Sequence, residues 1–165
     1  MKKNCLFFTL TLFVVFAFIL AGCVSPETPD SDSLTAESVK NTLCSGSWRV
    51  DPNKTPDCFW DEIWTFHKDG TYEDWWSEEA YQEYYKGFYT VTQADDGFIL
   101  YQKVTHSKEN ATADYTEMEA PMEFWYTIKS IDMDGMYLEC TKSNYGAGEL
   151  PHNPPIPNYY KREAD

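Results

Sequence analysis

Aromatic side chains are concentrated between Trp60 and Tyr89, and their chemistry suits the binding of a small molecule. The segment includes Trp60, Trp64, Trp75, Trp76, Tyr81, Tyr84, Tyr85, Phe88 and Tyr89. Ligand pockets are mostly apolar with a few polar groups, and aromatic faces also stack on sugar rings. The segment therefore predicts a packed protein interior, an apolar pocket or an exposed platform for carbohydrate, and all three remain open at this stage.

Pairs of carboxylates accompany these rings. They are Asp61/Glu62, Glu73/Asp74 and Glu78/Glu79. Glycosidases use two carboxyl groups about 5–10 Å apart in a cleft. Because the chain holds 27 acidic residues, some pair reaches that spacing by chance. We interpret these pairs as a solvated face.

The sequence contains no motif of nucleophilic, nucleotide-binding or zinc-dependent chemistry. Gly-X-Ser-X-Gly, His-Glu-X-X-His, Cys-X-X-Cys, Gly-X-Gly-X-X-Gly and the phosphate-binding P-loop are all absent from it. Its histidines, His67, His106 and His152, lie far apart in or beside predicted turns, so we expect solvated side chains and no metal site. We expect a non-catalytic protein without a cofactor.

Residues 1–22 have the pattern of a signal peptide. Lys2 and Lys3 precede a predominantly apolar run that ends in Leu20-Ala21-Gly22-Cys23. These last four residues resemble the lipobox of bacterial lipoproteins. The resemblance implies removal of the signal and a diacylglycerol anchor on Cys23, at the extracytoplasmic face of the cell membrane or envelope. An ordinary secretory signal and a membrane-anchoring helix are the alternatives.

The segment 23–33 is polar and contains prolines, which predicts a disordered tether before a domain at 34–165. The chain has 13 basic against 27 acidic residues, a formal charge of −14. Nucleic acid is thereby excluded as an expected partner, because phosphate binding needs a basic face. The expected partners are the membrane, through the lipid, and a small apolar ligand, an envelope protein or a sugar.

Three cysteines remain after the anchor, so at most one internal disulfide forms. Cys44 and Cys58 flank the Pro-rich connection 51–57, and we predict a disulfide between them. Cys140 shares a predicted strand face with Met136 and Leu138, as a small core residue would. A pair that includes Cys140, or three reduced thiols, are the alternatives.

The remaining pattern is mainly β. A short helix is predicted over 33–43 with Thr35 as its N-cap, while 77–86 favours a short helix or a loop. Strands are predicted at 47–50, 60–66, 71–76, 87–91, 98–105, 123–131, 136–141 and 159–162, and 106–121 and 143–158 are expected to be irregular. Short strands in succession favour an antiparallel up-and-down meander that closes into a small barrel.

The turn Lys68-Asp69-Gly70 allows two registers for the hairpin around it. A three-residue loop with Gly70 at positive φ sets Phe66 opposite Tyr72 and Trp64 opposite Asp74. This register keeps the apolar rings on one face, so we predict it.

Three motifs carry a family resemblance. Gly46-Ser47-Trp48 after a short helix is similar to the Gly-X-Trp signature of lipocalins and lipocalin-like domains. The runs Ile63–Tyr72 and Gly87–Val91 resemble the next strands of small lipocalin-like lipoproteins. The resemblance covers about residues 35–142. It implies a barrel with one open mouth, a partnership of Arg162 with Trp48 at the closed end and, more loosely, a small ligand.

Alternation along the predicted strands directs one set of side chains inward. We predict that Trp64, Phe66, Tyr72 and Tyr126 line an internal ligand pocket and that Trp75 points outward. Asp74 shares the inward face and would lie near the barrel mouth, where it could orient the polar end of a ligand. The carbohydrate alternative predicts instead an exposed, coplanar platform of Trp75, Trp76 and Tyr81.

Overall fold

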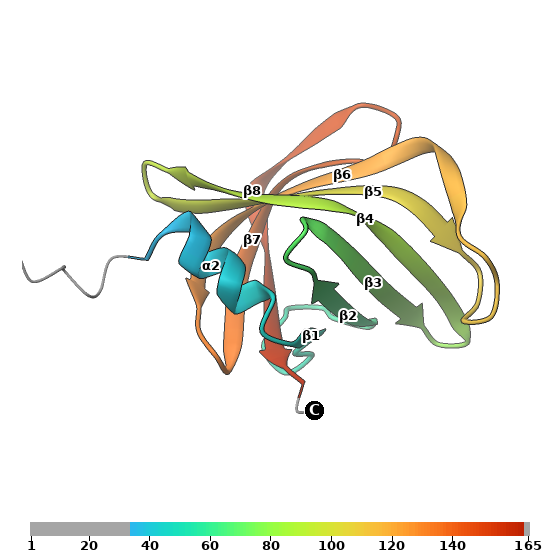
Figure 1. Ribbon diagram of the computed structural model, residues 1–165, viewed down its shortest axis with the longest axis horizontal. Coiled ribbons are helices and arrows are strands. Elements are labelled where there is room, and N and C mark those ends of the chain that lie inside the picture. Colours follow the sequence, from blue (N-terminus) through green and yellow to red (C-terminus); the bar gives the residue numbers. More distant parts are fainter. Residues whose placement is uncertain (1–33, 164–165) are drawn as a thin grey trace, which may run out of the picture. The chain divides into compact units, whose positions relative to one another are not determined.

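The computed structural model describes residues 34–163, which form one helix and eight strands (Figure 1). The helix α2 spans Ala36–Leu43, with Thr35 as its N-cap. The strands are β1 (Ser47–Val50), β2 (Asp61–Phe66), β3 (Thr71–Glu78), β4 (Tyr81–Ala94), β5 (Gly97–Lys108), β6 (Thr116–Ile131), β7 (Gly135–Asn144) and β8 (Glu149–Arg162). The predicted signal peptide, the tether and Cys23 lie outside the described residues. Within residues 34–163, no helix has the length and apolar character that a membrane crossing requires.

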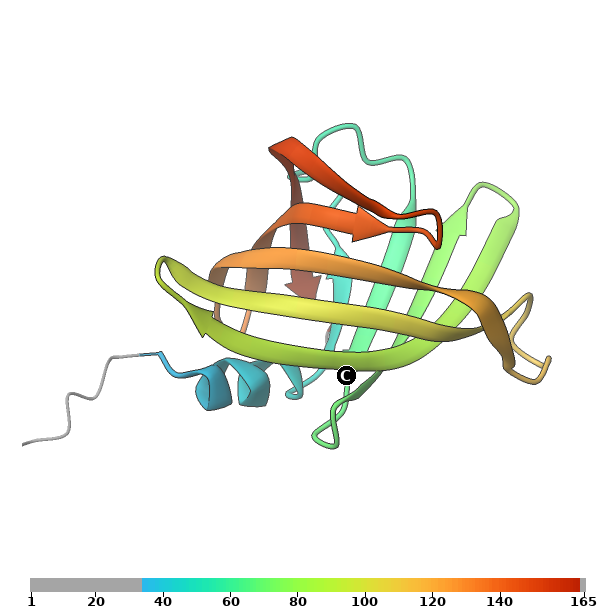
Figure 2. The same cartoon turned by 90° about the horizontal axis from the view of Figure 1, so that it is seen from above.

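The strands form a closed antiparallel barrel. Each strand pairs with the next, and β8 returns to pair with β1, so the sheet has no open ends (Figure 2). Closure places Trp48 opposite Arg162 and Val50 opposite Tyr160. The predicted fold class, an up-and-down meander with a short N-terminal helix, is confirmed.

The predicted register of the β2–β3 hairpin is also confirmed. Phe66 pairs with Tyr72 and Trp64 pairs with Asp74. Gly70 has a φ of +90°, a conformation that residues with a Cβ rarely adopt. The turn chemistry therefore sets which side chains of β2 and β3 face the interior.

Three segments differ from their predictions. Residues 106–121 are only partly irregular, because β5 continues to Lys108 and β6 begins at Thr116. Residues 77–86 are neither helix nor loop, because β3 continues to Glu78 and β4 begins at Tyr81. The helical spacing of tyrosines there is overridden by cross-strand pairing. Most of 143–158 is strand, because β7 and the first part of β8 pair with each other. The prolines are tolerated because β8 pairs with β1 only from Tyr160 onward. The Pro-rich part of β8 is thus a one-sided edge, where a missing N–H donor is tolerated.

The predicted disulfide between Cys44 and Cys58 is wrong in this structure. Cys44, Cys58 and Cys140 are all free. Cys44 follows α2, and its Sγ lies 3.1 Å from the hydroxyl of Tyr89. Cys58 lies beyond the other end of β1, with its Sγ 3.3 Å from the carbonyl oxygen of Trp60. The two thiols belong to opposite ends of β1, which keeps them apart.

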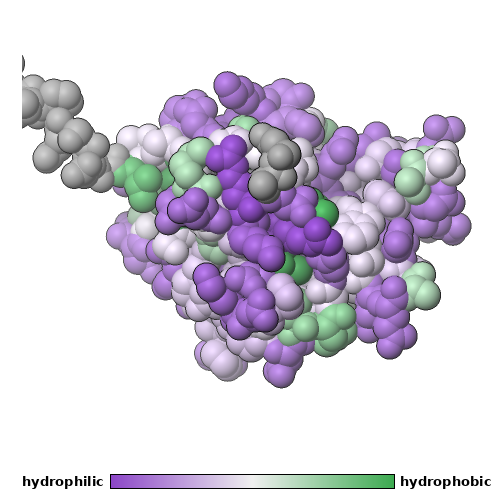
Figure 3. All heavy atoms as spheres, turned by 90° about the horizontal axis from the view of Figure 1, so that it is seen from below, coloured by the Kyte–Doolittle hydropathy of each residue, from purple (hydrophilic) through white to green (hydrophobic). Residues whose placement is uncertain are grey.

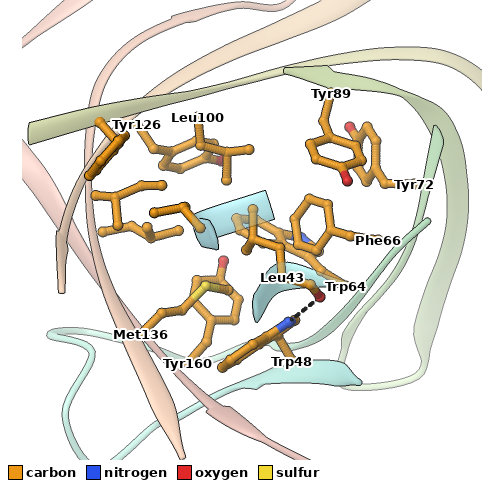
Figure 4. Close-up of a cluster of buried hydrophobic side chains, with 14 of the residues drawn as sticks. Leu43, Trp48, Trp64, Phe66, Tyr72, Tyr89, Leu100, Tyr126, Met136 and Tyr160 are labelled. Carbon is orange, nitrogen blue, oxygen red and sulfur yellow. Dashed lines mark hydrogen bonds between the residues drawn. The ribbon is translucent and has the colours of Figure 1, made fainter. Parts of the chain in front are cut away.

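One end of the barrel is filled by α2 and a packed core. In Figure 4 the helix lies behind the ring of strands, with Leu43 directed into the interior. Trp48 and Leu43 are both fully buried. The indole Nε1 of Trp48 donates a hydrogen bond of 2.9 Å to the carbonyl of Leu43, a group left unsatisfied by the helix end (Figure 4). Trp48 therefore joins the helix to the barrel.

Arg162 lies at the same end. Its guanidinium donates to the carbonyl of Ser45, and its backbone N–H donates to Asp134 across 3.0 Å. A Cβ at Gly46 would lie 2.7 Å from the Arg162 Nε, so the glycine makes room for the side chain. Two physical reasons thus explain the sequence Gly46-Ser47-Trp48: the glycine leaves space for Arg162, and the tryptophan is buried in the core.

One face of the exterior has the opposite character. The face shown in Figure 3 is dominated by hydrophilic side chains, with hydrophobic residues only in small separate patches. The fully buried side chains of the described residues are mostly apolar, as a closed sheet with one solvated face requires.

We predict that Trp48→Ala lowers the free energy of unfolding by about 3–5 kcal/mol, because it removes a buried ring and leaves a cavity. Chemical denaturation measures this loss. Trp125→Ala, which removes a half-buried indole on the outer face, is the matched control and should cost markedly less. Equal losses in the two variants would contradict the placement of Trp48 in the core.

Candidate ligand-binding cavity

A cavity of about 400 Å³ occupies the half of the barrel away from α2. Ser47, next to the helix, pairs with Thr65, so β2 reaches the packed core at its end and the cavity at its start. Eight aromatic residues line the cavity: Trp60, Trp64, Trp76, Tyr85, Phe124, Tyr126, Tyr145 and Tyr160. The volume and the aromatic lining are typical of sites for small organic molecules.

Trp64 forms the floor between the cavity and the core. Its ring stacks on Tyr160, with centroids 4.3 Å apart, and meets the edge of Tyr126 at 5.4 Å. Beneath it lies Phe66 (Figure 4). The centroid of its ring is 5.9 Å from that of Tyr72 and 4.9 Å from that of Tyr89. The aromatic stack fixes the depth to which a ligand could enter.

The structure divides the predicted pocket residues into two groups. Trp64, Asp74 and Tyr126 line the cavity together. Phe66 and Tyr72 are 3 % and 1 % exposed, and they fill the core below the floor instead of lining the cavity. Alternation predicts which face a side chain occupies, but it does not give the depth at which the packed core ends.

Glu62 is a central polar residue of the cavity that was not among the predicted site residues. Its carboxylate accepts hydrogen bonds from Tyr160 Oη at 2.7 Å, Trp64 Nε1 at 3.0 Å and Trp60 Nε1 at 3.4 Å. Glu62 alternates with Trp64 on β2 and with Trp60 just before that strand, and this spacing was the signal that could have found it. Donors from β2, from β8 and from the residue before β2 hold the carboxyl group in one orientation.

Burial raises the pKa of Glu62, and the hydrogen bonds from Tyr160, Trp64 and Trp60 oppose that shift. The charge of Asp61 raises the pKa further. Glu62 keeps some accessible surface, but this surface faces the cavity and the barrel wall surrounds the group. The balance favours the protonated form more than in a solvated glutamate.

Asp74 faces the same cavity from β3 and has a weaker set of partners. Its Oδ1 is shielded from solvent and has no hydrogen-bond partner among the described residues. Burial, and then the charge of Glu62, raises the pKa of Asp74 well above its usual range, and a hydrogen bond with Trp64 opposes the shift. The cavity thus contains two carboxyl groups that disfavour each other's ionisation.

Gln102 contributes a second unsatisfied group, from β5. The residue is 2 % exposed, and its Nε2 has no partner among the described residues. Gln102 and Asp74 both line the cavity. Buried polar groups normally find partners in protein or water, so an unpartnered donor and an unpartnered acceptor in one cavity indicate a place for a guest molecule.

The predicted solvated histidines have different surroundings. His67 and His106 line a smaller hollow of about 280 Å³ together with Lys86. His152 lines the main cavity, with its Nε2 3.0 Å from the hydroxyl of Ser143. Between residues 34 and 163, no three His, Cys, Asp or Glu side chains gather closely enough to hold a metal ion.

Cys140 is the thiol of the cavity. Burial raises the pKa of Cys140 to about 11, which keeps it protonated at neutral pH. A thiol in that state is a poor nucleophile. Its contribution to the cavity is a small apolar surface.

The three rings of the carbohydrate alternative do not form one platform. Trp76 lines the cavity, and Trp75 follows the opposite phase of β3. Tyr81 is 58 % exposed, and its ring meets that of Trp76 edge-on at 74°. A flat sugar surface would need these rings to be coplanar on the outside.

The unpaired carboxyl group generates a prediction about stability. Asp74→Asn should raise the free energy of unfolding at pH 7 by on the order of 1–3 kcal/mol, because folding the wild type at this pH requires Asp74 either to bury its charge or to bind a proton, and an amide needs neither. Folding raises the pKa of Asp74, so the folded state binds this proton more tightly than the unfolded chain. Stability therefore decreases as pH rises from about 4, where an unfolded aspartate titrates, and the advantage of the variant should vanish at low pH.

Urea denaturation at pH 4 and pH 7 measures this difference. Glu73→Gln removes the same charge from the exposed face of the same strand and serves as the control. A lower stability of Asp74→Asn than of the wild type at pH 7 would show that Asp74 is satisfied in the folded protein.

Comparison of the chain with protein-family models, with curated proteins and with solved structures finds no match.

Proposed function

We propose that the chain is a non-catalytic, membrane-anchored lipoprotein whose lipocalin-like barrel binds a small, largely apolar molecule. The observation that carries the proposal is the cavity of about 400 Å³ with its floor of Trp64, Tyr126 and Tyr160. A small barrel that needed its interior only for stability would fill it with side chains. Here one half is filled, and the other half is open and lined with aromatic rings.

The lipocalin-like part of the proposal has support at the closed end. A short helix precedes Gly46-Ser47-Trp48, and Trp48 lies opposite Arg162 in the β1–β8 pairing. The sequence resemblance implies these same features: a short helix, a glycine and a tryptophan after it, and an arginine late in the chain. Eight antiparallel strands in sequential order are consistent with the same kind of barrel.

The anchor is proposed from the sequence alone. The lipobox-like Leu20-Ala21-Gly22-Cys23 would place two acyl chains on Cys23, and two chains anchor a protein stably where one does not. Residues 24–33 would then separate the barrel from the membrane. With this arrangement the cavity binds its ligand at the extracytoplasmic surface of the cell.

A neutral fluorescent probe, N-phenyl-1-naphthylamine, tests ligand binding by the purified full-length chain. Saturable fluorescence enhancement is expected, because the probe moves from water into an apolar cavity. Replacing Phe124, a lining residue, in Phe124→Glu should weaken binding by about tenfold or more, since it puts a further acid among the rings. Trp75→Phe, on the opposite phase of β3, is the control and should bind like the wild type.

Absence of saturable binding to the wild type would refute an apolar-ligand function for this barrel. A titration with short oligosaccharides addresses the other ligand class. Saturable binding of the sugar alone, lost in Tyr81→Ala and retained in Phe124→Glu, would favour an exterior carbohydrate site instead.

Cys23→Ser is expected to move the protein from the membrane fraction to the soluble fraction without a change in its circular dichroism spectrum, because only the acyl attachment is lost. Immunoblotting of the two fractions measures the shift. Retention in the membrane fraction with the first 22 residues still attached would contradict the lipid anchor and indicate a helical one.

A further inference from the structure

We propose that the ligand of this cavity is an organic cation, a primary or secondary amine with an aromatic or aliphatic body. The inference rests on the proposed function, because it names the chemical class of molecule that the same cavity would take. Four features of the described cavity lead to it: its charges, the unpaired oxygen of Asp74, the fixed carboxyl of Glu62 and the surrounding aromatic faces.

The charged groups that line the cavity have one sign. The acidic residues are Glu62, Asp74 and Glu83, and no Lys or Arg is among the described lining residues. His152, the phenols and the Cys140 thiol are the other titratable groups there. A carboxylate ligand would meet like charge, whereas an ammonium group would meet opposite charge in a site of low dielectric constant.

Asp74 provides an acceptor that the protein leaves unused. Its Oδ1 is shielded from solvent and has no partner among the residues described. An ammonium group carries only donors, so it supplies what this oxygen lacks. Gln102, with its unpartnered Nε2, provides a donor to an oxygen atom of the ligand or to a water molecule beside it.

Glu62 differs from Asp74 because it already accepts three hydrogen bonds. The carboxyl group of Glu62 is therefore held in one orientation beside Trp64, where it can accept a hydrogen bond in either its ionised or its neutral form. Trp64 and Tyr160, two of the three donors to Glu62, stack on each other and also line the cavity. The same residues thus orient the carboxyl group and shape the surface beneath a bound cation.

Aromatic faces stabilise cations directly. An ammonium group over a Trp or Tyr face is attracted by the negative face of the ring, and more strongly when it is desolvated. Eight aromatic residues surround the carboxyl groups here. Rings and carboxylates together favour a cation that also carries apolar surface, because a hydrated metal ion has no apolar surface to bury against the rings.

Binding of such a cation would displace a proton. In the empty barrel the paired carboxyl groups favour a bound proton, since burial and mutual repulsion raise the pKa of Asp74. When the ammonium enters, Asp74 gives its proton to solvent and the ligand's positive charge takes its place. The ligand keeps its own proton, so charge in the cavity is conserved and one proton appears in the buffer.

Calorimetric titration with 4-phenylbutylamine, 4-phenylbutanol and 4-phenylbutyrate tests the inference, because the three probes share one body and differ in charge. At pH 7 we expect the amine to bind the wild type at least about tenfold more tightly than the alcohol, and the acid to bind weakest. Titration of the amine in two buffers of different ionisation enthalpy should show proton release, which binding of the alcohol should lack.

Asp74→Asn should abolish the preference for the amine and the proton release. Glu73→Gln, on the outer face of the same strand, should retain both. Gln102→Met should change the affinities for amine and alcohol by the same factor, because it alters no charge. Circular dichroism spectra verify the fold of each variant, and the proton release of the wild type provides a test that needs no variant.

Equal or tighter binding of the alcohol or the acid would overturn the inference. So would an amine preference that persists undiminished in folded Asp74→Asn. In both cases N-phenyl-1-naphthylamine would still bind if the proposed function is correct, whereas loss of binding of all four probes would refute the proposed function itself.

Discussion

The closure of the sheet by β1 is the constraint on which the rest of the structure depends. This strand has only four residues, yet it pairs with β2 on one side and β8 on the other. Trp48 is the most important residue of β1, because it buries a large ring, lies opposite Arg162 and donates a hydrogen bond to the carbonyl at the end of α2. Without that strand β2 and β8 would be open edges, and the interior would lose its enclosure.

The enclosed space is divided by side-chain chemistry. Near α2 the inward positions carry Leu43, Trp48, Phe66 and Tyr72, which pack without leaving room for a guest. Beyond Trp64 the inward positions include carboxyl and amide groups that cannot pack against apolar neighbours without cost. The cavity exists where the sequence places polar groups on an inward strand face, and the burial of these groups costs stability.

Much of this arrangement follows from local patterns in the sequence. Asp69-Gly70 determines the register of β2 and β3, and that register correctly brings Trp64 and Asp74 to one face. Alternation on β6 likewise places Tyr126 inside. These elements are predictable because turn geometry and the two-residue period act over a few neighbours.

The features that could not be predicted depend on distant parts of the chain. Phe66 and Tyr72 share a face with Trp64, but their burial below the floor follows from how far α2 and Trp48 fill the barrel. The Pro-rich part of β8 can be a strand because β1 is too short to pair with it, so its prolines need no N–H donor on that side. Gln102 alternates with Leu100 and Val104 on β5, but a polar residue in a predicted strand is normally solvated, so alternation alone did not mark it as buried. The free state of Cys44 and Cys58 follows from their separation along β1.

The central claim is that the half of the barrel above Trp64 is a binding site and not a defect of packing. A crystal structure of the protein with 4-phenylbutylamine tests it most directly. The account predicts electron density for the probe inside the barrel, with its nitrogen about 3 Å from a carboxylate oxygen of Asp74. Density for the probe only on the outer surface, or side chains that fill the space above Trp64, would contradict it.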